Sequence, residues 1–529
     1  MTRLGRRRRV TIIGAGMGGL AAAIDLARQG IQVDLLERQA APGGKMRVVP
    51  LATPHGEARL DAGPTVLTMR DVFEALFEDA GSLLDRHVTM HPAEILARHA
   101  WEDGTTLDLF ADTARSEQAI AELAGSGEAR RFRSFCASAA RIHRTLDQSF
   151  MRAPRPNVLS LTWRAGPLAL SRIRPFTRMA TALAQEFHDP RLRQLFGRYA
   201  TYCGSSPIDA PATLMLVAHV EQQGVWLVEG GMHRLAASMA ELATQLGATL
   251  RFDAPVREII VHNKKAVGVT LADGEHIESD AVLCNAETAS LAAGSFGADA
   301  RAAARPTPLR ARSLSAVTWS VVAETDGFPL VRHNVFFSGD ASGEFEDIFR
   351  HHRMPASPTV YVCAQDRDAG QDCSGPTGPH AGPERLLCLV NAPALGDQDR
   401  FDAVELDECE TRMMTRLQRS GVRLRPEVMQ RTGPREYAAL YPGTGGALYG
   451  PATHGWAASF SRPGSRSRLP GLYLTGGSVH PGPGVPMAAL SGRLAAARII
   501  SDLVSTSLSR RPAMAGGIST RSPMTDTPA

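Results

Sequence analysis

The chain has 529 residues, which is long enough for two or three domains of ordinary size. Its hydrophobic content of 43% and mean hydropathy of −0.13 argue against an integral membrane protein, and a formal net charge of +4 is too small for a dedicated nucleic-acid binder. Seven cysteines stand at scattered positions without a C-x-x-C spacing, so they predict neither a disulfide framework nor a metal site and fit a reducing cytoplasm.

The first predicted element is a short buried strand over residues 10–13, followed by a glycine-rich turn and an amphipathic helix. Gly14 allows a tight turn, Gly16 lets the backbone approach a pyrophosphate, and Gly19 lets the helix pack closely on the strand. A glycine-rich turn in some other α/β protein is the alternative. The strand and helix around the glycines favour a dinucleotide cradle.

A second strand is predicted over residues 31–36, and it ends in Glu37. A carboxylate at this position can accept hydrogen bonds from both hydroxyl groups of an adenosine ribose, and it would repel a 2′-phosphate. The unit therefore predicts a dinucleotide site that disfavours NADP.

Two short runs follow Glu37 along the chain: Gly-Gly-Lys-Met at residues 43–46 and Asp-Ala-Gly-Pro-Thr at residues 61–65. At this distance from a ribose-binding acid, they resemble the amine-oxidase and phytoene-desaturase superfamily of FAD proteins. The resemblance implies that the paired glycines lie under the diphosphate and ring system of FAD, and that Lys45 points at that region.

The middle of the chain changes pattern twice. The expected elements are, in chain order, an amphipathic helix over 72–84, short strands over 94–109 with a turn at 101–105, mostly helices over 115–219 (including 130–151 and 168–187), a helix from 233 to about 246, and strands over 248–252, 256–262, 266–271 and 281–284. Asp273-Gly274 is a hairpin signal. Residues 313–391 are again β-rich, with a loop over 368–384.

A late segment is predicted to return to the cradle. A strand ends just before Gly476 and Gly477, and a Gly/Pro-rich turn follows. Pro486 can open a helix over residues 487–497, whose N-terminal amides would face the pyrimidine edge of a flavin and stabilise negative charge there. A loop that only packs the domain together is the alternative.

Two residues of this turn raise questions of role. Many FAD proteins of this architecture carry an acid after the late glycine, but here Gly477 and Ser478 follow, so backbone N–H groups or Ser478 would have to contact the ribityl chain. His480 is a candidate general base, although a lone histidine beside Pro-Gly is more often a structural hydrogen-bonder. No catalytic acid or base is assigned.

Three longer runs narrow the resemblance: residues 63–69, 225–232 and 459–492. With these runs the chain is similar to bacterial carotenoid desaturases of the phytoene-desaturase type, and within them to the 1-hydroxycarotenoid 3,4-desaturases of purple photosynthetic bacteria. The resemblance implies an FAD-dependent oxidoreductase that transfers hydride to flavin N5 and forms a C3–C4 double bond in 1-hydroxyneurosporene or 1-hydroxylycopene during carotenoid biosynthesis.

Alternatives remain at this point. Among enzymes they are a phytoene desaturase, an FAD-dependent carotenoid isomerase and, more remotely, an amine or protoporphyrinogen oxidase. A non-enzymatic alternative is an isoprenoid-binding protein of the GDP-dissociation-inhibitor type. No second nucleotide fingerprint occurs, so the electron acceptor is expected to be a quinone or dioxygen rather than bound NAD(P).

The expected fold class is α/β, a Rossmann-like FAD-binding domain with an inserted mixed β/α substrate domain and a helical, membrane-contacting region. The expected parts are an FAD-binding domain in three pieces (1–113, 225–305 and 441–507), a helical insertion (114–224), a β-rich substrate domain (306–440) and a disordered tail (508–529). The residues expected at the cofactor are Gly14, Gly16, Gly19, Glu37, Arg38, Gly44, Lys45, Gly63, Pro64, Thr65, Val256, Gly476, Gly477, Val485, Pro486 and Met487.

A carotenoid is lipophilic, yet no stretch of about twenty apolar residues exists to span a bilayer. The candidate for a monotopic contact is the segment 157–187, which interleaves large apolar residues with arginines. A pair of amphipathic helices packed into the core is the alternative. The expected location is the cytoplasm, with peripheral association with the inner membrane.

Overall fold

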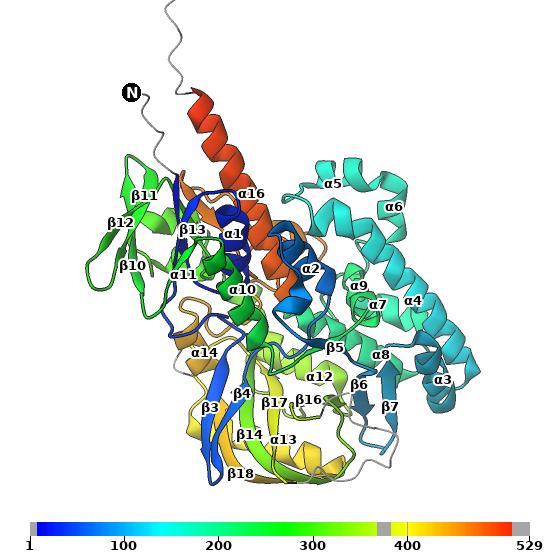
Figure 1. The fold of residues 1–529 in the computed structure, drawn as a ribbon. Coiled ribbons are helices and arrows are strands. Elements are labelled where there is room, and N and C mark those ends of the chain that lie inside the picture. Colours follow the sequence, from blue (N-terminus) through cyan, green and yellow to red (C-terminus); the bar gives the residue numbers. More distant parts are fainter. Residues whose placement is uncertain (1–7, 368–381, 399, 510–529) are drawn as a thin grey trace, which may run out of the picture.

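The computed structural model describes residues 8–367, 382–398 and 400–509 of the chain. Most of the loop expected over 368–384, and all but the first two residues of the tail expected to be disordered, lie outside these ranges. Within them the chain forms two large sheets with helices packed around them (Figure 1).

A five-stranded parallel sheet gathers segments from the whole length of the chain. Its order is β19-β13-β1-β2-β9, with β1 (Arg9–Ile13), β2 (Gln32–Leu36), β9 (Thr249–Arg251), β13 (Ala281–Cys284) and β19 (Leu472–Leu474). The apolar runs of β13 and β19 are buried throughout, as parallel strands covered on both faces require. The chain therefore leaves this sheet for a long stretch and returns to it twice, between β2 and β9 and again between β13 and β19.

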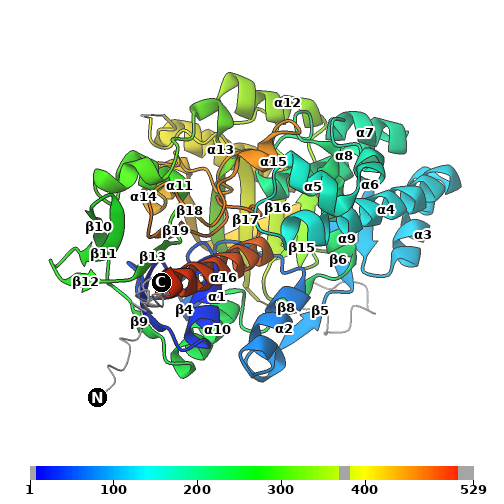
Figure 2. The ribbon, with the colours of Figure 1, turned by 90° about the horizontal axis from the view of Figure 1, so that it is seen from above.

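Helices cover this sheet, and the central pair meets at glycines. α1 (Met17–Ala27) is buried along its whole length and packs against α10 (His233–Gln245) and α16 (Val485–Ser509). A Cβ atom on Gly492 would lie 2.1 Å from the carbonyl oxygen of Gly18, so the two helices cross at a distance that only glycine permits. Figure 2 shows α16 alongside α1 near the middle of the molecule.

A mostly antiparallel seven-stranded sheet forms the second layer, in the order β18-β14-β17-β16-β15-β6-β7. Its strands are β6 (Ile95–Ala100), β7 (Thr106–Phe110), β14 (Ser315–Gly327), β15 (His333–Phe336), β16 (Val360–Ala364), β17 (Glu384–Ala392) and β18 (Val422–Thr432). Trp319 on β14 is fully buried in the core between this sheet and α13 (Ala403–Arg419).

The predicted hairpin near residues 101–105 is present, but it lies in the second sheet rather than beside the first. The backbone N–H of Trp101 donates to the carbonyl of Thr105, at 3.0 Å, and β6 pairs in parallel with β15. The sequence places residues 95–110 in the nucleotide domain because they precede the helical stretch. The pairing with β15, more than 230 residues later, instead attaches them to the substrate side.

Smaller sheets complete the fold: β3 (Val48–Thr53) with β4 (Gly56–Asp61), β5 (Met90–Pro92) with β8 (Trp226–Val228), and β10 (Val256–His262), β11 (Lys265–Leu271) and β12 (His276–Glu278). The turn predicted at Asp273-Gly274 joins β11 and β12. The remaining helices outside the insertion are α2 (Arg70–Asp79), α11 (Thr288–Ala293), α12 (Ala341–Glu346), α14 (Pro434–Leu440), α15 (Ala458–Ser461) and the short turns Leu84–Arg86, Asp299–Ala303, Leu309–Ala311 and Asp347–His351.

Residues 113–222 form the expected helical region, which lies on the opposite side of the molecule from β10–β12 (Figures 1 and 2). Its elements are α3 (Thr113–Ala124), α4 (Ser126–Leu146), a π-turn (Asp147–Met151), α5 (Val158–Ala165), α6 (Pro167–Arg172), α7 (Met179–Glu186), α8 (Pro190–Gly197), η3 (Arg198–Cys203), η4 (Ala212–Met215) and α9 (Leu216–Gln222). The helix expected over 168–187 is interrupted at residues 173–178. There Arg174 is left-handed, with φ 50°, and Pro175 disfavours helical geometry in the residue before it.

No helix in the described ranges is both long and apolar enough to cross a bilayer.

Candidate functional site

A cavity of about 1450 Å³ extends from the parallel sheet to the seven-stranded sheet and the helical region. It is larger than the ~300–1,000 Å³ of ordinary ligand pockets, so it has room for a dinucleotide and a second long molecule. All the residues predicted at the cofactor except Gly19 line it. One half is lined by the glycine-rich turns, and the other by apolar side chains.

The turn after β1 has the geometry predicted for a cradle. Gly14 has φ +98°, which side-chain-bearing residues rarely adopt. Gly19 faces away from the cavity, and a Cβ atom there would lie 2.1 Å from the carbonyl oxygen of Gly14. Its place is therefore in the packing of α1 against the turn.

Asn285, which sequence reasoning missed, holds this turn from the next strand. Its Nδ2 donates to the carbonyl oxygen of Gly14 at 3.2 Å, and a Cβ atom on Gly16 would lie 2.8 Å from the same nitrogen. Asn285 directly follows β13, so a polar residue at the carboxyl end of a buried parallel strand was the available signal.

Glu37 lies at the end of β2, as predicted, with 6% of its surface exposed. Its two oxygens accept the backbone N–H groups of Ala15 at 2.7 Å and of Gln39 at 2.9 Å. A carboxylate has lone pairs left after two such bonds, and these are available to ribose hydroxyls. Arg38 and Val256 line the same end of the cavity, and Arg38 also donates to the carbonyl of Leu440.

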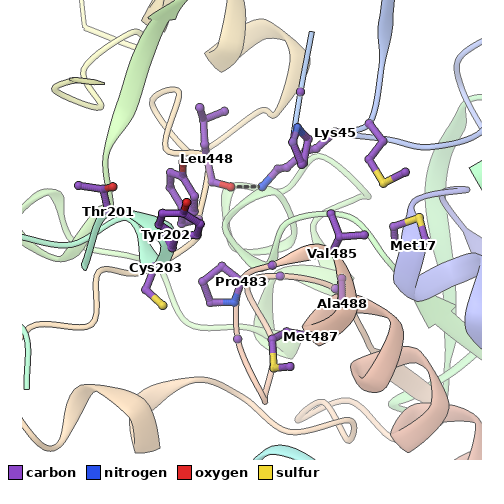
Figure 3. A pocket seen from close by; sticks show the side chains of 18 of the residues that line it. Met17, Lys45, Thr201, Tyr202, Cys203, Leu448, Pro483, Val485, Met487 and Ala488 are labelled. Atoms are coloured by element: carbon purple, nitrogen blue, oxygen red, sulfur yellow. Dashed lines mark hydrogen bonds between the residues drawn. The ribbon is translucent and has the colours of Figure 1, made fainter. Parts of the chain in front are cut away.

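The paired glycines form a second turn against the first. The N–H of Gly43 donates to the carbonyl of Ala15 at 2.9 Å, and Gly44 has φ +60°. Next to them, Lys45 Nζ donates to Glu287 Oε1 at 2.6 Å. It also donates to the carbonyl of Leu448 at 2.5 Å (Figure 3). The ammonium group therefore lines the cavity while it ties this turn to two later segments.

Gly63 fits between the second turn and the seven-stranded sheet. A Cβ atom on it would lie 1.8 Å from the carbonyl oxygen of Lys45. Just beyond, Thr65 shares a 2.6 Å hydrogen bond with the hydroxyl of Tyr361, which is also 2.8 Å from Nδ1 of His333. The strip from Gly63 to Thr65 thus lies against the second turn at one end and is hydrogen-bonded to the seven-stranded sheet at the other.

The late segment returns to the cavity, as predicted. Gly476 has φ +107° beside Asn285, and the first turn of α16 lines the cavity from Val485 to Ala488 (Figure 3). The helix begins two residues earlier than predicted and presents the positive end of its dipole there. Ser478 accepts the N–H of Thr288 at 3.1 Å and is 2% exposed, so Gly477, and not Ser478, faces the cavity.

Arg462 is a buried side chain that holds this segment in place, and no local pattern in the sequence predicts that role. Its guanidinium donates to the carbonyls of Tyr449 at 3.2 Å, Gly477 at 2.9 Å and Pro451 at 2.6 Å. Only 2% of it is exposed, and burial lowers the pKa of Arg462 to about 10.

His480, the candidate general base, is not among the described residues that line the cavity. Its Nε2 lies 3.0 Å from the carbonyl oxygen of Ala153, and its ring stands edge-on to Phe150 with 4.9 Å between ring centroids. Burial lowers the pKa of His480 to about 4, so it is neutral at pH 7. This position joins the late segment to the helical region.

The other half of the cavity is mainly apolar. Its lining from the helical region and the second sheet includes Leu146, Met151, Leu183, Val220, Phe337 and Leu389. Arg198 and Tyr202, both on η3, are polar groups among them. Such a lining suits a lipophilic ligand that is oriented by a few polar contacts.

Comparison with known proteins gives consistent matches over nearly the whole chain. A family model described as flavin containing amine oxidoreductase matches residues 17–500. The chain is 50% identical over 527 residues to the hydroxyneurosporene desaturase of Rubrivivax gelatinosus, with 98% of both chains covered. It is 44% identical over 504 residues to the protein of the same name from Cereibacter sphaeroides, which covers 94% of this chain and 99% of that one.

Among solved structures, an oxidoreductase from Methanosarcina mazei matches with a TM-score of 0.58 and 15% identity. The match covers 93% of this chain and 100% of the other. At that identity the likeness shows the fold alone.

Proposed function

The chain belongs to the carotenoid desaturases of the flavin-containing amine oxidoreductase family, and from this premise we propose that it introduces a C3–C4 double bond into 1-hydroxycarotenoids. The predicted family, α/β fold class, FAD cofactor and oxidoreductase activity are confirmed. The observation that supports the proposal is one continuous cavity that joins the dinucleotide cradle to an apolar chamber.

The residues of the cradle fit FAD. Gly16 and Gly63 let the turns pack where a Cβ atom would overlap Asn285 or the carbonyl of Lys45, and Glu37 has lone pairs available for a ribose. The first turn of α16 directs backbone dipoles at the part of the cavity that follows the cradle. These residues would hold the adenosine, the diphosphate and the ring, in that order along the cavity.

When bound, FAD supplies at N5 the hydride acceptor that removal of two hydrogens from adjacent carbons requires. The protein's own residues align the hydrocarbon and exclude water, since Leu183, Phe337 and Leu389 surround it with apolar surface. The positive end of α16 would stabilise the negative charge that a bound flavin gains on reduction. A cation next to a polyene is delocalised, so loss of the second hydrogen as a proton needs no strong base.

Product chromatography tests the substrate assignment. The purified protein is incubated in liposomes with phytoene, neurosporene or 1-hydroxyneurosporene. We expect 3,4-desaturation of the hydroxylated substrate and little conversion of phytoene. Fast conversion of phytoene would refute the assignment, and an isomer without net oxidation would favour the isomerase. A protein without a flavin spectrum would favour the isoprenoid-binding alternative.

We also propose that α5 and α6 contact the bilayer, at the cytoplasmic face of the inner membrane. Leu159, Trp163 and Leu168 are 82%, 85% and 74% exposed, and Phe176, in the loop after α6, is 75% exposed. The segment also carries Arg164, Arg172, Arg174 and Arg178. Exposed apolar side chains beside arginines suit a water–lipid boundary and do not fit a pair of helices packed into a core.

The end of the cavity lies close to this surface, which supports the same proposal. Ala180, Leu183 and Ala184 of α7, the next helix, line the cavity. Phe176 stands edge-on to Trp456, at 5.3 Å between ring centroids. A lipophilic substrate could therefore pass from the bilayer into the cavity over a short apolar path.

Liposome flotation tests the membrane contact. We expect the wild-type protein to float with anionic liposomes and the Leu159→Ser/Trp163→Ser double variant to remain mostly in the dense fraction. Val404→Ser is the matched control, because Val404 is 64% exposed on α13. Equal flotation of the double variant and the wild type would contradict the contact.

For the electron acceptor, we propose a quinone or dioxygen. Turnover in the absence of oxygen, with and without a soluble quinone, separates the two. Turnover that needs oxygen identifies dioxygen, and anaerobic turnover that needs the quinone identifies the quinone.

A further inference from the structure

Three polar side chains form a connected group at the wall of the apolar chamber. The hydroxyl of Tyr202 donates to Glu221 Oε1 at 2.8 Å, and the hydroxyl of Tyr199 donates to the other oxygen of Glu221. Tyr202 lines the cavity, whereas Glu221 lies behind it and is 3% exposed. Burial raises the pKa of the Glu221 carboxyl, and the hydroxyl groups and Arg198 oppose that rise.

Arg198 faces the same chamber with most of its hydrogen-bonding capacity unused. Among the described residues, its guanidinium has one hydrogen bond, a long one of 3.5 Å from Nη2 to the oxygen of Tyr202. A guanidinium carries five N–H donors, so those of Arg198 that make no hydrogen bond are free to meet a ligand in the chamber. A ligand oxygen at this place would supply the missing acceptor.

Arg198 and Tyr202 together match the hydrogen-bonding pattern of an alcohol. An alcohol has one O–H donor and two lone pairs. Arg198 can donate to its oxygen. Since the proton of Tyr202 is already directed at Glu221, the phenol oxygen is left as an acceptor for the alcohol's proton.

The two residues are also held close to the flavin-facing segment. After η3, Gly204 approaches so tightly that a Cβ atom on it would lie 2.6 Å from Tyr449 Cβ. A Cβ atom on Gly450, the residue after Tyr449, would in turn lie 2.9 Å from Cα of Ser478 in the late segment. Figure 3 shows Tyr202 across the pocket from Val485.

This proximity is what a 3,4-desaturation requires. In a 1-hydroxycarotenoid only a few bonds separate the oxygen on C1 from C3 and C4. A group that binds the hydroxyl must therefore stand beside the place where those carbons react, and not at the far end of the chamber.

We propose that Arg198 and Tyr202 bind the 1-hydroxyl group of the substrate and so determine the preference for hydroxylated carotenoids. Arg198 donates to the hydroxyl oxygen, and Tyr202 accepts the hydroxyl proton. The inference rests on the proposed function, because it assumes that a hydroxycarotenoid is the substrate.

The test compares paired substrates, 1-hydroxyneurosporene and neurosporene, in liposomes. For Arg198→Met we expect kcat/KM for the hydroxylated substrate to fall about 30-fold, and for Tyr202→Phe about tenfold, since a polar partner is lost in a buried site. Neurosporene, which lacks the hydroxyl, should be affected less than about twofold. The ratio of the two kcat/KM values therefore falls, mainly through KM.

Two matched variants show whether the loss is local. Arg193 lies on α8, just before η3, and also lines the cavity, but its guanidinium already donates to the carbonyl of His188. Tyr199 also donates to Glu221 but does not line the cavity. Arg193→Met and Tyr199→Phe should leave the substrate ratio within about twofold of wild type. An equal loss in Tyr199→Phe and Tyr202→Phe would overturn the role of the Tyr202 hydroxyl.

Other outcomes are also decisive. Equal losses for both substrates in Arg198→Met and Tyr202→Phe would show that the pair acts on the flavin or the fold, and would overturn the inference. Flavin absorbance and the melting temperature identify a variant that fails to fold; if Arg198→Met does so, Arg198→Lys and Tyr202→Phe provide the comparison. If the wild type converts neither substrate, the proposed function fails. If it prefers the hydroxylated substrate and the variants keep that preference, only this inference fails.

Discussion

The half of the cavity lined by the glycine-rich turns is built mainly from backbone, whereas the apolar half, here called the substrate half, is built from side chains. At Gly63 a Cβ atom would lie 1.8 Å from a carbonyl oxygen, and at Gly19, behind the first turn, 2.1 Å, both far inside van der Waals contact. In the substrate half, Leu183 and Leu389 only provide apolar surface, and a volume-conserving exchange there costs little. The comparison teaches that one half admits a single residue type at its key positions and the other admits many.

The largest expected effect comes from filling the backbone-built half. Gly63→Ala should destabilise the protein by more than about 3 kcal/mol and abolish flavin retention, because the new Cβ overlaps the carbonyl of Lys45. Gly127→Ala is the control, since nothing lies within 4 Å of its Cβ position. Chemical denaturation and absorbance near 450 nm measure both effects. A stable, yellow Gly63→Ala protein would break the comparison.

Arg462 tests a long, buried side chain on which the backbone-built half depends. Arg462→Met should cost about 2–3 kcal/mol and weaken FAD binding, because it leaves buried carbonyls of Tyr449, Pro451 and Gly477 without donors. Arg466→Met removes an exposed ion pair with Asp502 and should cost less than about 1 kcal/mol. Titration of FAD into apoprotein gives the dissociation constants. Equal FAD affinities in the two variants would show that the late segment keeps its position without Arg462.

His480 joins the late segment to the helical region. We expect its replacement to change how the free energy of unfolding depends on pH, and to leave turnover nearly unchanged. Its ordinary pKa of 6.5 falls to about 4 in the folded protein because of burial. The unfolded chain therefore binds more protons between these values, and stability falls as the pH drops through them. From pH 7.5 to 5 the loss is about 2 kcal/mol, which His480→Gln should remove.

Denaturation curves at both pH values measure this difference, with the exposed His55→Gln as control. At pH 7.5 we expect turnover of His480→Gln within about twofold of wild type. A protein that keeps its flavin and its stability but loses turnover would instead place His480 in the reaction.

The smallest effect is expected at the exposed surface of the helical region. The Leu159→Ser/Trp163→Ser double variant should change the free energy of unfolding by less than about 0.5 kcal/mol, because both side chains already face solvent. Denaturation in detergent-free buffer checks this. A large loss would mean that the two side chains pack in solution and would contradict their assignment to a lipid surface.

The sequence predicted the backbone-built half well because glycines at fixed spacing and Glu37 leave a local pattern. The roles of Asn285 and Arg462 were not predicted, because each side chain binds backbone atoms that are distant in sequence. Asn285, for example, donates to the carbonyl of Gly14. The hairpin over 95–110 was recognised as strands but not as part of the second sheet, because only its pairing with β15 decides that. In the helical region, Pro175 was visible, yet the interruption it causes was not predicted.

The order in which the chain is synthesised gives the sheet topology a further meaning. β1 and α1 leave the ribosome first, but β19 and α16, which complete their sheet and cover α1, leave last. Until then the edge of β13 and the glycine-lined face of α1 have no partner within the nascent chain. The cavity is accordingly complete only after the C-terminal segment has folded back against β13 and α1.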